Sequence, residues 1–253
     1  MSFQERIDKL NKLIAESRYI VFFTGAGIST GSGIPDFRSA DGLYTTSVEA
    51  NPEYMLSKTC LEMEPERFFA YLRNYMDFRG YKPNIAHQKI SELQRARTVS
   101  VITQNIDGLH EKAGSKVVDT IHGTMNRFYC PGCLHDTYMP EDVLDGNFDN
   151  ADGVPKCPLC GGEYVVRPDI TLYEENLPGN AWTNAQYHAG AADLFIVVGT
   201  SLQVSPANQL PYYFGDKKKL VIINRESTPM DNKAGLVFHE DIGEVFDKIV
   251  IPE

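Results

Sequence analysis

Residues 22–38 read FFTGAGISTGSGIPDFR, in which an apolar run breaks into a glycine-rich loop. The run YIVFFT (19–24) is short, aromatic and β-branched, which predicts a buried β-strand. Gly25 and Gly27 follow it directly, where missing Cβ atoms let the backbone turn tightly and approach a phosphate. Thr30 stands where a full dinucleotide-binding fingerprint has its third glycine. A strand-to-helix turn without a ligand is therefore the alternative.

Similar apolar runs recur along the chain and alternate with helical patterns. They lie in TVSVITQN (98–105), KVVDTIHG (116–123), DLFIVVGT (193–200) and KKLVIINRE (218–226). Helical spacing marks residues 3–14 and 85–96. This alternation predicts an α/β fold with a doubly wound, Rossmann-like parallel sheet.

Two segments interrupt the alternation. Residues 45–84 are rich in Glu, Met and aromatic side chains and are predicted to form a helical insertion, which we also take as a cofactor-loop region. Residues 126–164 hold paired cysteines and are predicted to form a smaller domain. The main nucleotide-binding domain would then comprise residues 1–44, 85–125 and 165–253.

Composition restricts the class of protein. The chain has 253 residues, a formal net charge of -10 and 14 prolines, and its apolar content suffices for a sizeable core. An acidic surface repels phosphate backbones, so we expect no nucleic-acid partner. The N-terminal MSFQERIDKLNKL is charged throughout, and no stretch of 18 uncharged apolar residues occurs, so we expect no membrane association and a cytoplasmic location. The sequence does not determine the oligomeric state.

Four of the five cysteines form two Cys-x-x-Cys pairs. Each pair contains or precedes Gly or Pro, which can form a tight knuckle, and two knuckles supply the four thiolates that tetrahedral zinc prefers. Because cysteines fill all four positions, the zinc would be structural, with no open position for water. The ligands are Cys130, Cys133, Cys157 and Cys160.

Polar residues close most of the predicted strands. In a parallel α/β sheet the carboxyl ends of the strands meet at one edge, where ligands bind. Amides and a carboxylate in TQNIDGLH suit hydrogen bonds to a ribose or a carboxamide, and His122 in DTIHGT suits general-base work. Any one of these residues could be an ordinary polar residue at the end of a strand, and the prediction of a ligand site rests on their occurring together. The residues concerned are Thr24, Gln104, Asn105, Asp107, His122, Thr200 and Asn224.

Taken together and in this order, GAGISTGSGIPDFRS, TQNIDGLH, HGT, the two cysteine knuckles, RPD, GTSLQVSPA and IN resemble the sirtuins, the NAD-dependent protein lysine deacylases. The resemblance covers about residues 20–242. It implies a large NAD-binding domain and a small zinc-ribbon domain, with NAD and an acyl-lysine peptide entering the cleft between them. It assigns catalysis to His122 and Asn105. The residues that it assigns to NAD are Gly25, Ala26, Gly27, Ile28, Thr30, Asp36, Phe37, Arg38, Gln104, Asn105, Ile106, Asp107, Gly199, Thr200, Ser201, Asn224, Arg225 and Ile242.

The resemblance also implies which part of NAD each group of residues contacts. Residues 26–28 would line the pyrophosphate and its ribose, and residues 36–38 would belong to a lid over NAD. Residues 104–107 would contact the nicotinamide ribose and the carboxamide. The adenosine half would lie against residues 200–201, Asn224 and Ile242.

The implied reaction begins when the acyl oxygen attacks the nicotinamide ribose and expels nicotinamide. This leaves an alkylimidate. His122 would then act as general base on the ribose hydroxyls, so that a hydroxyl attacks the imidate carbon, and water completes the reaction to free lysine and O-acyl-ADP-ribose. Nearby Asp and amide groups would stabilise the positive character of the first transition state.

Two departures from the family bear on specificity. The stretch RPDITLYEENLP has Tyr173 and Glu174 where many members have Phe and Gly, which predicts a preference for Lys or Arg beside the acylated lysine. Members that remove succinyl or malonyl groups carry a Tyr-x-x-Arg motif, whereas Asn74 stands three residues after Tyr71 here. We therefore expect neutral acyl groups, acetyl or longer apolar chains.

Three other functions are alternatives to the deacylase interpretation. An NAD-dependent protein ADP-ribosyltransferase shares the first chemical step, but has less need of a base such as His122. A catalytically idle zinc and nucleotide-binding module would not need Asn105, Asp107 and His122. A zinc-ribbon nucleic-acid binder is disfavoured by the acidic charge.

Overall fold

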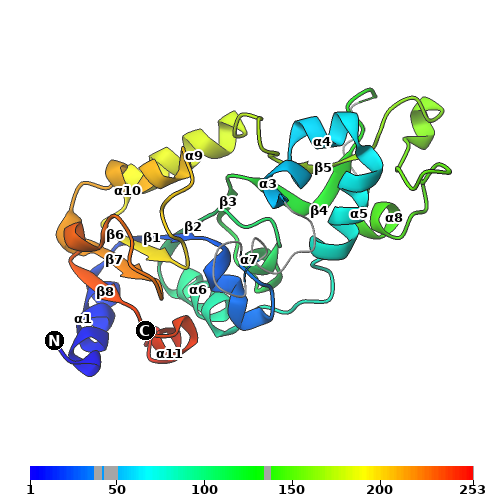
Figure 1. Cartoon of the computed structure of the whole chain (residues 1–253). Helices are drawn as coiled ribbons and strands as arrows, with labels where there is room; N and C mark the ends of the chain where they lie inside the picture. Colours follow the sequence, from blue (N-terminus) through cyan, green and yellow to red (C-terminus); the bar gives the residue numbers. More distant parts are fainter. Residues whose placement is uncertain (37–41, 43–50, 134–137, 253) are drawn as a thin grey trace.

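The central feature of the computed structural model is a six-stranded sheet, and residues 1–36, 42, 51–133 and 138–252 are described (Figure 1). All the strand pairs in this sheet are parallel, and the order is β3-β2-β1-β6-β7-β8. This confirms the predicted doubly wound sheet. The strands are β1 (Tyr19–Thr24), β2 (Thr98–Thr103), β3 (Val118–Thr120), β6 (Leu194–Val198), β7 (Leu220–Ile223) and β8 (Leu236–Phe238).

The direction of winding reverses beside β1. The chain continues from β1 to β2 on one side, whereas β6 pairs with the other side of β1, with Phe22 opposite Ile196 and Thr24 opposite Val198. The loops that leave β1 and β6 therefore diverge from one point at the carboxyl edge. In doubly wound sheets this is where a crevice opens for a ligand.

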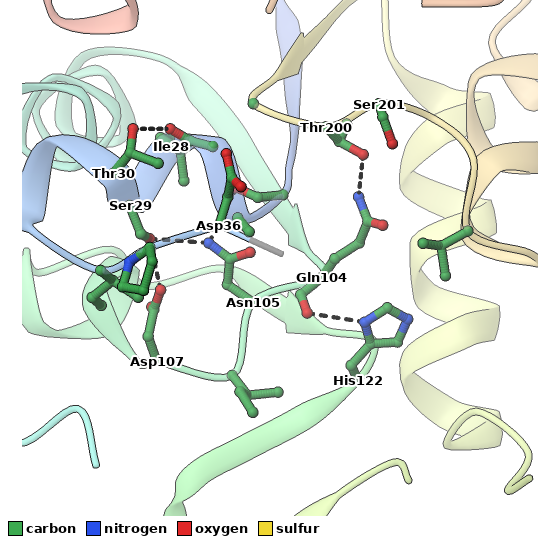
Figure 2. A pocket seen from close by; sticks show the side chains of 18 of the residues that line it. Ile28, Ser29, Thr30, Asp36, Gln104, Asn105, Asp107, His122, Thr200 and Ser201 are labelled. Atoms are coloured by element: carbon green, nitrogen blue, oxygen red, sulfur yellow. Dashed lines mark hydrogen bonds between the residues drawn. The ribbon is translucent and has the colours of Figure 1, made fainter. Parts of the chain in front are cut away.

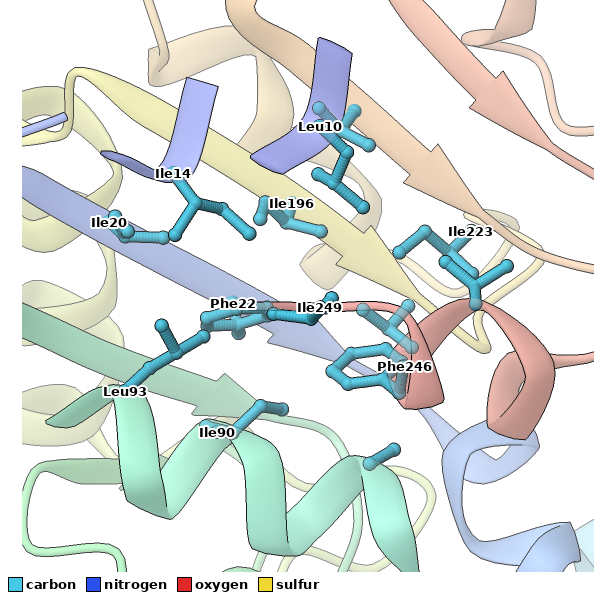
Figure 3. Close-up of a cluster of buried hydrophobic side chains, with 14 of the residues drawn as sticks. Leu10, Ile14, Ile20, Phe22, Ile90, Leu93, Ile196, Ile223, Phe246 and Ile249 are labelled. Carbon is cyan, nitrogen blue, oxygen red and sulfur yellow. The ribbon is translucent and has the colours of Figure 1, made fainter. Parts of the chain in front are cut away.

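Helices cover both faces of the sheet, as the burial of alternate strand residues requires. Ile20 and Phe22 belong to one apolar cluster, and Val21 and Phe23 to another. Figure 3 shows the first cluster, where α1 (Phe3–Glu16), α6 (Ile85–Ala96) and α11 (Ile242–Asp247) pack against the sheet. The opposite face is covered by α9 (Gly179–Ala191) and α10 (Leu210–Tyr213).

A second, smaller part of the molecule contains the paired cysteines. Its two-stranded antiparallel sheet is formed by β4 (Gly123–Tyr129) and β5 (Arg167–Ile170). The helices α3 (Pro52–Met55), α4 (Lys58–Met63) and α5 (Pro65–Tyr75) share one apolar cluster with this sheet. The helical segment and the cysteine segment are therefore packed together, and the exact domain ranges stay our proposal. Shorter elements are the helices α7 (Leu109–Lys112) and α8 (Pro140–Leu144) and the 3₁₀ helices η1 (Ala26–Ser32), η2 (Pro158–Cys160), η3 (Ala207–Gln209), η4 (Lys217–Lys219) and η5 (Asp231–Lys233).

Arg73 on α5 joins the helices to the cysteine segment. Its guanidinium donates to the carbonyls of Leu144, Gly153 and Val143 at 3.1, 2.8 and 3.1 Å. It also forms an ion pair with Asp149 at 2.8 Å. The planar fork of arginine suits such a set of converging acceptors.

The sequence patterns missed the edge strand β8. Its three residues, in GLVFHE, are too few to show a clear period, and Leu236 and Phe238 are buried in the first apolar cluster, to which α1 contributes. Arg6 and Lys9 on α1 donate to the carbonyls of Val237 and Gly235 at 2.9 and 2.8 Å. These side chains satisfy carbonyls at the sheet edge, which would otherwise be free to pair with another chain.

None of the helices in the described part of the chain combines the length and the apolar character that crossing a bilayer requires.

The contacts of Arg73 predict its contribution to stability. Arg73→Met keeps the apolar stem but removes a donor from three carbonyls and from Asp149, so the free energy of unfolding should fall by about 2 kcal/mol or more. Urea unfolding measures this. Arg67→Met is the control on the same helix, because Arg67 pairs with Glu64 on the surface, and it should change the value by less than about 0.5 kcal/mol. Equal effects of the two variants would contradict the role given to Arg73.

Candidate functional site

A pocket of about 920 Å³ opens where the sheet winding reverses. Its walls come from the loops after β1, β2, β6 and β7 and from the segment after β5. The described residues that the sequence assigned to NAD or to catalysis all line it. They are Gly25, Ala26, Gly27, Ile28, Thr30, Asp36, Gln104, Asn105, Ile106, Asp107, His122, Gly199, Thr200, Ser201, Asn224, Arg225 and Ile242. Phe37 and Arg38 lie outside the described residues.

Glycine is required in the loop after β1 because the backbone of this loop contacts the loop after β6. A Cβ on Gly27 would lie 2.8 Å from the Cα of Gly199, and one on Gly25 would lie 2.7 Å from the Cβ of Thr200. The Gly27 N–H donates to the Gly199 carbonyl at 2.8 Å. Gly199 itself has a φ of 63°, a conformation that favours glycine. The sequence predicted that the missing Cβ atoms let the backbone of this loop approach a phosphate. In the structure they let it approach the backbone of the loop after β6.

Ser29, Asn105 and Asp107 form one hydrogen-bonded network at the pocket wall (Figure 2). The Ser29 hydroxyl donates to Asp107 Oδ2 at 2.6 Å and accepts from Asn105 Nδ2 at 3.1 Å. Asn105 Nδ2 also lies 3.2 Å from the Gly25 carbonyl. The amide and the carboxylate are therefore held in fixed orientations by the loop after β1.

Burial raises the pKa of Asp107, and the hydrogen bonds from Ser29, Leu109 and Asn105 oppose that rise. The Leu109 N–H donates to Asp107 Oδ1 at 2.9 Å, so the two carboxylate oxygens have different partners. A carboxylate in a buried wall responds strongly to positive charge that develops beside it.

Sequence reasoning missed Ser29. The residue is 1% exposed and lines the pocket, yet it lies among small polar residues in the loop and carries no motif of its own. Its only signal was position, two residues beyond Gly27 in a loop already expected to bind a ligand.

His122 lies between β3 and β4 with one ring nitrogen engaged. Its Nδ1 is 2.9 Å from the Gln104 carbonyl, which can only accept, so Nδ1 carries the hydrogen and Nε2 keeps the lone pair (Figure 2). Burial lowers the pKa of His122 below the ordinary 6.5, although the bond to Gln104 acts in the opposite direction. The ring is therefore neutral at pH 7 and equipped to accept a proton.

Gln104 connects the ends of two strands that are not neighbours. Its Nε2 donates to Thr200 Oγ1 at 2.9 Å, while its carbonyl holds His122. The same Thr200 Oγ1 accepts from the Leu202 N–H at 3.3 Å. This cross-link reaches over the end of β1, because β1 separates β2 from β6.

The opposite end of the pocket lies at β7 and α11. Asn224 Nδ2 donates to the Glu226 carbonyl at 2.8 Å, and the Arg225 guanidinium lies 3.5 Å from Asp241. Among the described residues that line the pocket, Arg225 is the only Lys or Arg. Ile242 begins α11 beside them.

The wall contributed by the smaller part of the molecule is apolar. Tyr75, Met76, Phe78, Ile106 and Leu172 line it, and all five belong to or pack against the second apolar cluster. Such a wall suits an uncharged, apolar group.

The four paired cysteines meet at one point. Their Sγ atoms lie within 4.8 Å of one another, and the pairs Cys130–Cys160 and Cys133–Cys157 are each 3.7 Å apart. Zn–S bonds of about 2.3 Å place neighbouring sulfurs of a tetrahedron roughly 3.8 Å apart, whereas a disulfide needs about 2.05 Å. The geometry therefore fits the predicted zinc.

The zinc site serves structure, since four thiolates fill a tetrahedral shell. The Tyr138 hydroxyl lies 3.1 Å from Cys157 Sγ, where it can donate to the thiolate. None of the four cysteines lines the large pocket.

Comparisons with known proteins give one consistent family. A model described as "Sir2 family" matches residues 25–206. An "NAD-dependent protein deacetylase" of Clostridium perfringens is 43% identical over 249 residues, which are 97% of this chain and 99% of the relative. Proteins of the same description from Staphylococcus aureus (strain MRSA252) and Cutibacterium acnes are 44% and 45% identical, and each match covers 96% of this chain and 98% and 96% of the relative.

Solved structures agree with the sequence relatives. A Sir2 variant with deacetylated p53 peptide and 3'-O-acetyl ADP ribose has a TM-score of 0.86 at 37% identity, covering 98% of this chain and 97% of that chain. Sir2Tm bound to a propionylated peptide has a TM-score of 0.83 at 36% identity, covering 96% of each chain.

The cysteine geometry predicts the effect of losing the metal. Purified protein should contain about one zinc per chain, and Cys157→Ser should lose it, with lower thermal stability and faster hydrogen exchange in residues 123–170, because the ligands come from both ends of this segment. Metal analysis and exchange mass spectrometry measure the two effects. Cys60→Ala is the control, since Cys60 is buried in α4 and is not one of the four clustered thiols, and it should keep its zinc. Retention of zinc by Cys157→Ser would refute the assignment.

Proposed function

The chain belongs to the Sir2 family, and from that premise we propose that it is an NAD-dependent protein lysine deacylase. It would transfer a neutral acyl group from a lysine side chain to NAD, with release of nicotinamide and O-acyl-ADP-ribose. The observation that carries this proposal is the meeting of His122, Asn105, Asp107 and the glycine loop in one pocket at the reversal of the sheet. The comparisons support it, because this chain matches relatives described as NAD-dependent protein deacetylases over nearly their full length.

The division of the pocket suggests where each substrate would lie. The glycine loop and the ends of β6 and β7 would hold the pyrophosphate and adenosine of NAD, and Asn105 and Asp107 would face the nicotinamide half. The apolar wall with Tyr75, Met76 and Phe78 would border the acyl group. The acylated peptide would run past the segment 173–177, which lines the same pocket.

NAD would supply the electrophilic ribose carbon that accepts the acyl oxygen. The protein's part begins with Asp107 and Asn105, whose fixed orientation favours the positive character that develops beside them. His122 then accepts a proton from a ribose hydroxyl at Nε2, because Nδ1 is committed to the Gln104 carbonyl. Water would then complete the release of free lysine and O-acyl-ADP-ribose.

Location and other partners complete the proposal. We propose a cytoplasmic protein, because the zinc site requires four reduced thiols. We also propose that nucleic acid is not a partner, because the net charge is -10.

The deacylase reaction is tested by mass spectrometry of an acetyl-lysine peptide with and without NAD. Wild-type protein should remove the acetyl group only with NAD and form O-acetyl-ADP-ribose, and His122→Ala should reduce turnover by at least about 100-fold. His188→Gln is the control, because His188 bonds to Tyr19 away from the pocket, and it should stay active.

Because the pKa of His122 lies below 6.5, the rate should be level from pH 7 upward and should fall only as the pH drops below 6.5 and Nε2 becomes protonated. NAD consumption with a mass gain on protein would instead indicate ADP-ribosyl transfer.

A second prediction concerns the acyl group. Arg79, the arginine nearest to this wall in the sequence, already pairs with Asp77 and Asp145 at 2.7 Å each and does not line the pocket. Asn74 is exposed on α5 and does not line it either. None of the described residues that form this apolar wall is a Lys or Arg, so a succinyl or malonyl carboxylate bound against it would lack a cationic partner there.

We accordingly expect kcat/KM for acetyl and propionyl peptides to exceed that for succinyl and malonyl peptides of the same sequence by at least about 100-fold. Steady-state kinetics on the four peptides measure the ratio. Comparable rates would show that a cation reaches the acyl group.

A third prediction concerns the residues beside the acylated lysine. Glu174 is exposed at the pocket and has a φ of 75°, and its Oε2 accepts from the Thr59 N–H and hydroxyl at 3.0 and 2.7 Å. Glu175 is instead paired with Arg167 at 2.8 Å. Among the described residues Glu174 has no ion-pair partner, so it brings a negative charge to this edge of the pocket.

Peptides with Lys or Arg flanking the acylated lysine should react about two- to fivefold faster than peptides with Glu, and added salt should reduce the difference. Glu174→Gln should remove the preference while it keeps an acceptor for Thr59. Glu163→Gln is the control at an exposed site away from the pocket. A preference that survives Glu174→Gln would have another cause.

A further inference from the structure

Asn84 lies directly before α6 and uses both ends of its side-chain amide. Its Oδ1 accepts from the Ala86 N–H at 2.9 Å and so caps the helix. Its Nδ2 donates to the Ile28 carbonyl at 2.7 Å and to Ser32 Oγ at 3.0 Å. Because the Ala86 N–H only donates and the Ile28 carbonyl only accepts, the orientation of this amide is fixed by its partners.

These bonds reach η1, the part of the glycine loop that lines the pocket. The approach is close, because a Cβ on Gly31 would lie 3.2 Å from Asn84 Nδ2. Asn84 also lines the pocket, although no motif in the sequence singled it out. Helix α6 is a firm support, since Ile90 and Leu93 anchor it in the first apolar cluster (Figure 3).

The other hydrogen bonds that attach this loop lie at Gly25, Gly27 and Ser29. The Gly27 N–H bonds to Gly199, and the Gly25 carbonyl accepts from Asn105. A seven-residue 3₁₀ helix has little stability of its own, so its later residues need a second anchor. Asn84 supplies it at Ile28 and Ser32, on either side of Ser29, which holds Asp107.

We propose that Asn84 is a positioning residue for NAD, which fixes the later half of the glycine loop against α6 before the cofactor binds. This inference rests on the proposed function. A loop that is ordered beforehand binds without a further loss of conformational freedom, so the tether acts chiefly on affinity for NAD. It acts less on the chemical step, which His122 carries out from another strand end.

The test separates the tether from the helix cap. Asn84→Ser keeps a hydroxyl that can cap α6 but lacks the Nδ2 donor, and Asn84→Asp keeps the capping oxygen and also lacks the donor. Both variants should raise KM for NAD by about tenfold, with kcat reduced by less than about threefold. KM for the acetyl-lysine peptide and the melting temperature should stay close to wild type. Calorimetric titration of NAD should show the same loss of affinity.

Asn11→Ser is the matched control. Asn11 likewise donates to one carbonyl, that of Lys248, and accepts from one N–H, that of Val250, at 3.0 and 2.9 Å, but it lies away from the pocket. It should leave KM for NAD unchanged.

Two results would overturn the inference alone. In the first, Asn84→Ser deacylates as fast as the wild-type protein and its KM for NAD stays within twofold of the wild-type value. In the second, Asn84→Ser has a lower kcat and a lower melting temperature but an unchanged KM for NAD. If the wild-type protein consumes no NAD with any acyl peptide, the proposed function itself fails and the inference falls with it.

Discussion

The contact between the backbone at Gly27 and the backbone at Gly199 is the constraint on which the rest of the site depends. The two loops leave adjacent parallel strands at the reversal of the sheet and come close enough that a Cβ at either glycine would overlap the other loop. This contact directs η1 across the carboxyl edge of the sheet. Ser29 is thereby brought to Asp107 and Asn105, and the three side chains orient one another. A bulkier residue at either position would displace the loop and with it the pocket wall.

The pocket also depends on a second packing unit. The sheet and its helices supply the polar wall, and the cluster shared by α3–α5 and the cysteine segment supplies the apolar wall. Zinc ligands hold one side of that cluster, and Arg73 joins its helices to the loops around Asp149. The polar and the apolar walls of the pocket are thus supported by separate apolar clusters.

Burial sets the protonation states within this arrangement. It lowers the pKa of His122 and raises that of Asp107, and hydrogen bonds limit both effects. The histidine is left neutral with Nε2 free, while the carboxylate is held by Ser29 and Leu109. A neutral base and an oriented carboxylate at separate strand ends suit a reaction that first develops positive charge and then removes a proton.

The sequence by itself determined the features that reside in local pattern. Alternating apolar runs gave five of the six strands of the sheet, glycines after the first strand marked the loop, and two Cys-x-x-Cys pairs marked the zinc site, since in each case the signal lies within a few neighbouring residues. Only the tertiary structure decided which distant residues support them. β8 was missed because it is short and its burial comes from an apolar cluster formed by distant elements, and Ser29, Arg73 and Asn84 were missed because their roles arise from partners up to 80 residues away. A single polar side chain carries no period, and its partners are fixed only when the strands and helices have packed.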